Sequence, residues 1–215
     1  MAIFQHEALL EKYVDAKDYI INEGYVAEID WQSGLNFDST SESDFLRESA
    51  WVILSSGMRE TVIRKKFEDI EASFLKFISA KDIVLNADEC REKAISEFSH
   101  DKKIDAIISL STRVVVDGFD IVKKQIKHYG IRYLQSFDFI GPATSYHLAK
   151  NLGLCVSKPD RHLCRVADVT GFESVEVLCD TLSDCTGDSA SVVDLVIWRF
   201  ATLNSDYVSW FRIKE

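Results

Sequence analysis

The chain has 215 residues, which is enough for one large domain or two small lobes with a substantial core. It is 47% hydrophobic and 28% charged, the balance of an ordinary globular protein, and its net charge is −10. No apolar run approaches the length of a membrane span and residues 1–20 mix charges throughout, so we expect neither a membrane segment nor a signal peptide.

Helical periodicity dominates the first quarter of the chain. Residues 6–24 read as an amphipathic helix that ends at a glycine, and residues 25–42 read as a loop rich in Asp, Ser and Gly. A second helix is predicted over residues 43–57, and either Ser41 or Ser43 has the side chain to cap it.

The rest of the chain is predicted to be helical too. Residues 59–78 continue as helix with room for one break, and Asn86 and Glu89 have the spacing of a capping box. Residues 103–115 suit a buried helix or a strand, and their helical neighbours favour the helix. Five further helices are predicted over residues 119–130, 131–137, 144–153, 160–171 and 189–201. We therefore predict one all-α domain over residues 1–215, folded as two packed lobes with a cleft between them.

Both prolines of the chain lie in one basic segment. Pro142 and Pro159 are 17 positions apart, and between Ile121 and Val166 eight Lys or Arg residues face only two acids, a net charge of +6. A basic face on an acidic protein is compatible with DNA binding. A solvated face with an uneven charge pattern is the alternative.

The first proline turn is FIGPAT. Gly141 permits positive φ, Pro142 fixes φ, and a helix begins near Thr144. The amides beside the glycine and in such a first helical turn offer a site for a phosphate oxygen. An ordinary corner between two helices is the alternative.

The second proline turn is SKPDRHLCRVA, in which Pro159 places Asp160 at or next to a helix N-cap. Capping the helix is one role for this carboxylate. The other role is to stay ionised at the helix N-terminus and face a developing positive charge.

Together these residues resemble the helix-hairpin-helix DNA glycosylase superfamily. The stretch FDFIGPATSYHLAKNLGL is similar to the hairpin of the bacterial 3-methyladenine DNA glycosylases. Asp160, His162, Leu163 and Arg165 match the short Asp-x-His-hydrophobic-x-Arg pattern of the endonuclease III and adenine-mispair branch. Residues 48–67 resemble, more weakly, the early helix and the loop that wedges into DNA in this superfamily.

The resemblance implies an all-α fold with a hairpin at about residues 131–152 and a cleft that faces DNA. It implies that Asp160 is the catalytic carboxylate. The residues implied to bind the DNA backbone are Gly141, Ala143, Thr144, Lys158 and Arg161.

Two departures from the pattern limit the activity that the resemblance implies. Ala143 stands where strand-cutting members have their Schiff-base lysine, so a monofunctional glycosylase without lyase activity is expected. Cys179 and Cys185 are too few for the iron–sulfur cluster of some relatives, and the zinc site of the 3-methyladenine branch is not recognisable. A third departure is Phe139, which stands where many members have the first hairpin glycine. We expect no metal and no cofactor, and mostly buried thiols in a reducing cytoplasm.

The base pocket and the wedge are assigned by position in the resemblance. Met58 or Arg59 could fill the gap left by a flipped base, and the alternative is Met58 in the core behind a helix-ending Gly57. Trp31, in a polar loop, is favoured for stacking, whereas core packing is favoured for Trp51. Glu48 could accept hydrogen bonds from a damaged purine or pair with Arg47.

The expected function is hydrolysis of the N-glycosidic bond of a damaged or modified base that is flipped out of duplex DNA. An alkylated purine is favoured as the base, and a bulky modified pyrimidine of foreign DNA is the other choice. The expected protein is a cytoplasmic, nucleoid-associated monomer. A non-catalytic helix-hairpin-helix module that binds DNA is the alternative function, and a pure binding module has no need of Asp160.

Overall fold

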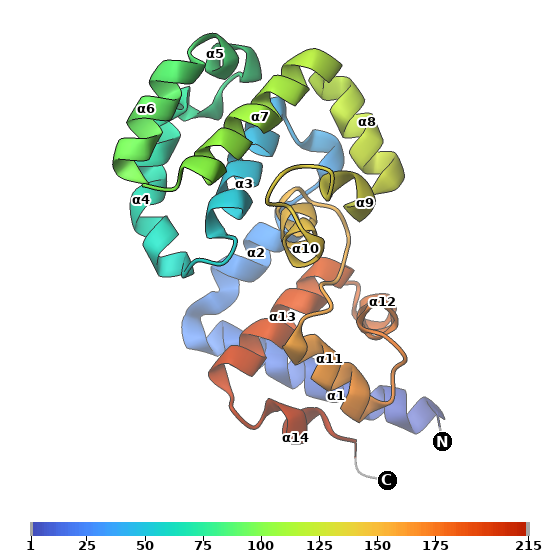
Figure 1. The fold of residues 1–215 in the computed structure, drawn as a ribbon. Coiled ribbons are helices and arrows are strands. Elements are labelled where there is room, and N and C mark those ends of the chain that lie inside the picture. Colours follow the sequence, from blue (N-terminus) through green and yellow to red (C-terminus); the bar gives the residue numbers. More distant parts are fainter. Residues whose placement is uncertain (1, 214–215) are drawn as a thin grey trace. The chain divides into compact units, whose positions relative to one another are not determined.

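The computed structural model describes residues 2–213, with side chains described from residue 7 onward except that of Glu60. Within this range every regular element is a helix and no strand is present, so the predicted all-α class is confirmed (Figure 1). None of these helices is long and apolar enough to cross a membrane. The chain forms two compact units, unit 1 (Met1–Leu35 with Gly153–Glu215) and unit 2 (Asn36–Leu152).

Unit 1 joins the two ends of the sequence around α13. Its helices are α1 (Ala2–Ile20), η1 (Ile21–Tyr25), α2 (Val26–Gly34), α11 (Arg161–Thr170), α12 (Val175–Thr186), α13 (Ala190–Leu203) and α14 (Tyr207–Phe211). Helix α13 packs against α1, α2, α11, α12 and α14, as the red and blue ribbons of Figure 1 show for α13 and α1. Its buried residues lie on nearly all sides, as expected of a helix that is apolar on several faces.

Unit 2 is built around α7. Its helices are η2 (Phe37–Ser39), α3 (Glu42–Ser55), α4 (Glu60–Ser73), η3 (Leu75–Phe77), α5 (Ala80–Leu85), α6 (Ala87–Glu97), α7 (Asp101–Asp117), α8 (Phe119–Tyr129), α9 (Ile131–Leu134) and α10 (Pro142–Asn151). Helix α7 packs against α3, α5, α6 and α8. Ile104, Ile107, Leu110 and Val114 recur at helical spacing on its buried face, so amphipathic periodicity explains why this segment is a helix rather than a strand.

The start of α3 follows the expected capping chemistry. Ser41 is its N-cap, and the Ser41 hydroxyl accepts a hydrogen bond from the amide of Asp44 while the Asp44 carboxylate accepts one from the amide of Ser41. Of the two candidate caps, Ser41 is therefore the one used. This reciprocal pair satisfies two amides that the helix cannot satisfy itself.

Several predictions about local structure are wrong. Residues 26–34 form α2 instead of a loop, and the predicted capping box at Asn86 is absent because its side-chain amide donates to the carbonyl of Asp82. Helix α12 was not predicted, although its buried residues recur at helical spacing. Only two of the five thiols are buried, Cys90 and Cys179, whereas Cys155, Cys164 and Cys185 are exposed.

Candidate functional site

The segment that resembles the hairpin is, in unit 2, a pair of helices joined by a turn at residues 135–141. Leu134, Phe137 and Ile140 are buried before the second helix, α10, begins. Across the turn the side-chain amide of Gln135 donates to the hydroxyl of Ser145 at 3.1 Å. The turn is therefore fixed by apolar anchors and by one polar link to α10.

Within this turn the positive φ lies at Phe139 and not at Gly141. Gly141 has φ −88° and ψ −170°, an extended conformation open to any residue, whereas Phe139 has φ 62°. The amide of Gly141 donates to the hydroxyl oxygen of Thr144 at 2.8 Å. The amides of Ala143 and Thr144 are the N-terminal amides of α10 that have no carbonyl partner within the helix.

Phe139 is 37% exposed, and its ring contacts His100, which precedes α7, and Lys103 on α7. Its edge-on contact with the ring of His100 has a centroid distance of 6.1 Å. The Nζ atom of Lys103 lies 6.0 Å from the Phe139 ring centroid, at the outer limit of a cation–π contact. Packing of the ring thus accompanies a backbone conformation that is uncommon for a residue with a Cβ atom.

Asp160, in unit 1, is the N-cap of α11. Its Oδ1 atom accepts hydrogen bonds from the amide of His162 at 2.7 Å and from the amide of Leu163 at 3.0 Å. Among the residues whose side chains the structure describes, its Oδ2 atom has no hydrogen-bond partner. The capping role is therefore realised, and it leaves the second carboxylate oxygen for another contact.

Buried polar residues of α13 fix the backbone that leads to Asp160. The hydroxyl of Ser191 accepts from the amide of Val156 at 3.1 Å and lies 2.9 Å from the carbonyl oxygen of the same residue. Asp194, only 3% exposed, accepts a hydrogen bond from the amide of Lys158. Asp194 and Ser191, one helical turn apart on α13, thus supply hydrogen bonds to a backbone segment that forms no helix or strand of its own.

The predicted backbone-binding cations flank Asp160. The backbone amide of Lys158 donates to Asp194, and Lys158 is half-buried. Arg161 is exposed, and its Nε donates to Nε2 of His162 at 3.2 Å. The His162 ring lies 5.3 Å from the ring of Tyr207, and its buried Nδ1 has no partner among the described residues.

The five predicted pocket and wedge residues are divided between the two units. Trp31 lies in α2 of unit 1, is 49% exposed and belongs to a helix rather than to the expected polar loop. Glu48 and Trp51 lie on α3, and Met58 and Arg59 follow that helix, all in unit 2. Trp51 packs edge-on against Phe67 with a centroid distance of 5.0 Å, as expected for a residue with a packing role.

The carboxyl group of Glu48 lies between two polar partners. One oxygen accepts from the side-chain amide of Asn151 at 2.9 Å, and the other pairs with Arg47 at 3.1 Å. Burial raises the pKa of Glu48, and the contacts to Asn151 and Arg47 oppose that rise. Both expected roles remain open, because the pairing with Arg47 is present and the carboxyl group also faces α10.

The loop at residues 56–59 connects α3 with α4. Gly57 has φ 69°, a conformation that favours glycine, and Met58 is 40% exposed. The alternative that placed Met58 in the core is therefore wrong. Arg59 is exposed and is the N-cap residue of α4.

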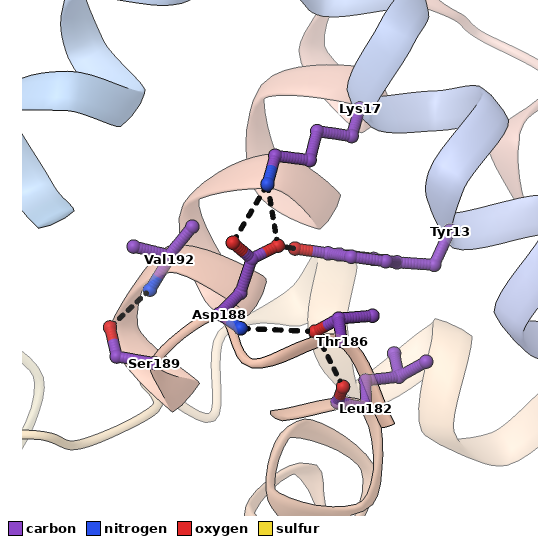
Figure 2. Close-up of polar contacts among 7 residues, drawn as sticks. All are labelled: Tyr13, Lys17, Leu182, Thr186, Asp188, Ser189 and Val192. Carbon is purple, nitrogen blue, oxygen red and sulfur yellow. Dashed lines mark hydrogen bonds and ion pairs between the residues drawn. The ribbon is translucent and has the colours of Figure 1, made fainter. Parts of the chain in front are cut away.

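Two further polar clusters were not predicted from the sequence. Lys103 on α7 is only 2% exposed, and its ammonium donates to the carbonyls of Leu54 and Ser56, each at 2.6 Å. In unit 1, Figure 2 shows Lys17 and Tyr13 converging from α1 on Asp188.

The Asp188 cluster ties the turn between α12 and α13 to α1. Lys17 Nζ lies 2.7 Å from both carboxylate oxygens, and the fully buried Tyr13 hydroxyl donates to one of them at 2.7 Å. Burial and the Asp188 carboxylate raise the pKa of Tyr13. A cavity of about 410 Å³ adjoins these residues. The spacing of Tyr13 and Lys17, one helical turn apart, is the sequence signal that both face the same partner.

No family model matches this chain, and no curated protein and no solved structure matches it.

Proposed function

We propose that the chain is a monofunctional DNA glycosylase that flips a damaged or modified base out of the duplex and hydrolyses its N-glycosidic bond. The support is the resemblance of the two proline turns to helix-hairpin-helix glycosylases. The observation that carries the proposal is the carboxylate of Asp160. One oxygen is held by two amides, the other has no partner among the described residues, and the preceding backbone is bound by Ser191 and Asp194.

In this proposal Asp160 acts on the sugar of the flipped nucleotide. Breaking the bond between C1′ and the base nitrogen leaves the bonding electron pair with the base and positive charge on the sugar. The carboxylate stabilises that charge, and a water adds to C1′ and gives its proton to the carboxylate, which passes it on to solvent or to the departed base. The amides of His162 and Leu163 hold the Asp160 carboxylate in place for this role.

Residues at the start of α10 in unit 2 and residues beside Asp160 in unit 1 hold the DNA backbone in the same proposal. The amides of Ala143 and Thr144 and the side chains of Lys158 and Arg161 bind phosphates, which fixes register without reading sequence. Use of the Gly141 amide by a phosphate requires Thr144 to give up its hydrogen bond. The favoured base is an alkylated purine, with a bulky modified pyrimidine as the second choice.

A non-catalytic DNA-binding module is the second candidate. The observation in its favour is that Asp160 already has a complete structural role as the cap of α11. The two candidates differ in whether replacement of the carboxylate removes a chemical activity or only stability.

The deciding experiment measures free bases released from genomic DNA and from chemically alkylated DNA by mass spectrometry. We expect release by the wild type and loss of release, by at least about a thousandfold, in Asp160→Asn, since a positioned charged group contributes on that order. Asparagine is an equally good N-cap, so Asp160→Asn should keep its stability within a few tenths of a kcal/mol.

Matched variants separate catalysis from stability. Asp160→Ala removes the cap as well and should cost about 1 kcal/mol in the free energy of unfolding. Ser174→Ala removes the N-cap of α12 at a similar cost and should keep base release. Wild-type turnover by Asp160→Asn would refute the catalytic assignment, and salt-dependent binding without release by any variant would favour the binding module.

A further inference from the structure

One buried ammonium in unit 2 lies beside both the loop that carries the predicted wedge residues Met58 and Arg59 and the turn that leads into α10. Lys103 lies on α7, yet its Nζ donates to the carbonyls of Leu54 and Ser56, where α3 ends and the 56–59 loop begins. The same Nζ lies 6.0 Å from the ring centroid of Phe139 in the 135–141 turn. The 56–59 loop carries Met58 and Arg59, and the turn leads directly into α10.

The contacts of Lys103 to α3 satisfy groups that the helix leaves free. The last carbonyls of a helix have no amide partner within it, and a cation at that end is favourable. Lys103 is 2% exposed, and desolvation lowers its pKa. Burial of an ammonium is costly unless it is hydrogen-bonded, so two carbonyls at 2.6 Å account for its presence there.

The contact of Lys103 to Phe139 involves the one residue of the turn with a strained backbone. Phe139 has φ 62°, a left-handed conformation that is disfavoured for a residue with a Cβ atom. Such a conformation persists where the surroundings determine it, and His100 and Lys103 are among the neighbours of this ring, while the Thr144 hydroxyl donates to the Phe139 carbonyl. Lys103 thus joins the turn to the end of α3, beside the direct packing of Phe45 of α3 against Phe137 of the turn.

We infer that Lys103 is a positioning residue, which sets the 56–59 loop and the 135–141 turn relative to each other so that both contact one DNA duplex. This inference rests on the proposed function. A wedge works only when its loop and the backbone contacts engage the same nucleotide step, because insertion and unstacking occur at a fixed distance from the bound phosphates. Lys103 fixes that distance within unit 2 without touching DNA itself.

The test compares Lys103→Met with the wild type, since methionine keeps the unbranched apolar stem and removes the ammonium. Hydrogen exchange of the free protein should become about tenfold faster or more at residues 55–59 and at residues 137–141 together. Lys81→Met, which replaces an exposed lysine on α5 of the same unit, is the matched control and should change neither segment.

The DNA probe is a duplex that carries one tetrahydrofuran abasic-site analogue beside a 2-aminopurine. Wild-type binding should raise the 2-aminopurine fluorescence, because an inserted side chain unstacks the neighbouring base. Lys103→Met should bind with an affinity within about threefold of wild type, since phosphate contacts supply most of it, and should lose the fluorescence rise. Phe139→Leu, which removes the ring but keeps apolar bulk, tests the same coupling if Lys103→Met does not fold.

Three outcomes separate the inference from the proposed function. Faster exchange at residues 55–59 alone, or a retained fluorescence rise in both variants, would show that Lys103 only caps α3 and would overturn the inference. A wild type that neither binds the duplex nor changes its fluorescence would overturn the proposed function instead. In that case joint exchange of the two segments still decides whether Lys103 couples them.

Discussion

The carboxyl group of Glu48 experiences two opposing influences. Burial favours its neutral form, while the amide of Asn151 and the guanidinium of Arg47 favour the carboxylate, and burial is the larger. The pKa of Glu48 in the folded protein therefore lies above its ordinary value of 4.5. A carboxyl group of this kind binds protons more readily in the folded than in the unfolded state.

The pH dependence of stability should report this effect. As pH rises from about 4.5 through the raised folded pKa, the free energy of unfolding of the wild type should lose the contribution of Glu48, because the folded state then gives up a proton that the unfolded state has already lost. Glu48→Gln keeps an acceptor for Asn151 and removes the titration. Denaturant unfolding should show a stability gap between Glu48→Gln and wild type that shifts in favour of the variant as pH rises through this window, and a gap independent of pH would contradict the shift.

Single residues also mark where sequence reasoning fails. Gly141 permits positive φ, but Phe139 is the residue of this turn that has it, and the Phe139 ring contacts His100 and Lys103 from a distant part of the chain. Lys103 itself could not be predicted, since lysine is almost never fully buried and its partners Leu54 and Ser56 lie about fifty positions earlier. The N-cap position of Asp160 could be predicted, because capping depends on residue types that are adjacent in the sequence.

At the scale of elements, helices were predictable where an apolar face repeats at helical spacing. The buried face of α7 shows this pattern clearly, and the buried residues of α12 show it as well once the helix is known. Helix α2 was missed because Ser, Gly and Asp suit loops, and because Gly24, with φ 91°, interrupts the preceding helix. Packing against α13, which no local rule contains, accounts for the helical state of α2.

Helix α13 supplies a second testable element. Asp194→Ala removes the acceptor for the amide of Lys158 and leaves a buried donor unpaired, which should cost about 1–3 kcal/mol in the free energy of unfolding. Hydrogen exchange should accelerate at residues 156–158, and base release should fall with it if the segment positions Asp160.

Thr202→Ala, an exposed polar change on the same helix, provides the comparison and should stay within about 0.5 kcal/mol of wild type. Equal stability and equal exchange in Asp194→Ala and Thr202→Ala would mean that α13 does not fix the backbone before Asp160.

At the scale of the whole molecule, charge is distributed unequally between the two units. Unit 1 has 8 Lys or Arg against 17 Asp or Glu, a net charge of −9, whereas unit 2 has 17 against 18, a net charge of −1. The net charge of unit 1 repels a DNA backbone much more strongly than the net charge of unit 2 does. In the glycosylase proposal most of the favourable phosphate contacts should therefore come from unit 2.

The salt dependence of DNA binding tests this division. Arg132 lies on α9, is exposed and belongs to the basic segment, so Arg132→Gln should reduce the slope of log affinity against log salt by about one if it contacts one phosphate. Lys81→Gln removes an exposed cation from α5 of the same unit and should leave the slope unchanged. Equal slopes in all three proteins would exclude Arg132 from the backbone contacts.

The unequal placement of cysteine gives the molecule a chemical probe of its own. All three exposed thiols belong to unit 1, and the one cysteine of unit 2, Cys90, is 1% exposed with a pKa raised by burial. A maleimide should therefore modify native unit 1 at once and reach unit 2 only when that unit opens. The slow phase of alkylation, read by mass on the peptide that contains Cys90, measures how often unit 2 unfolds in the intact protein without any engineered label.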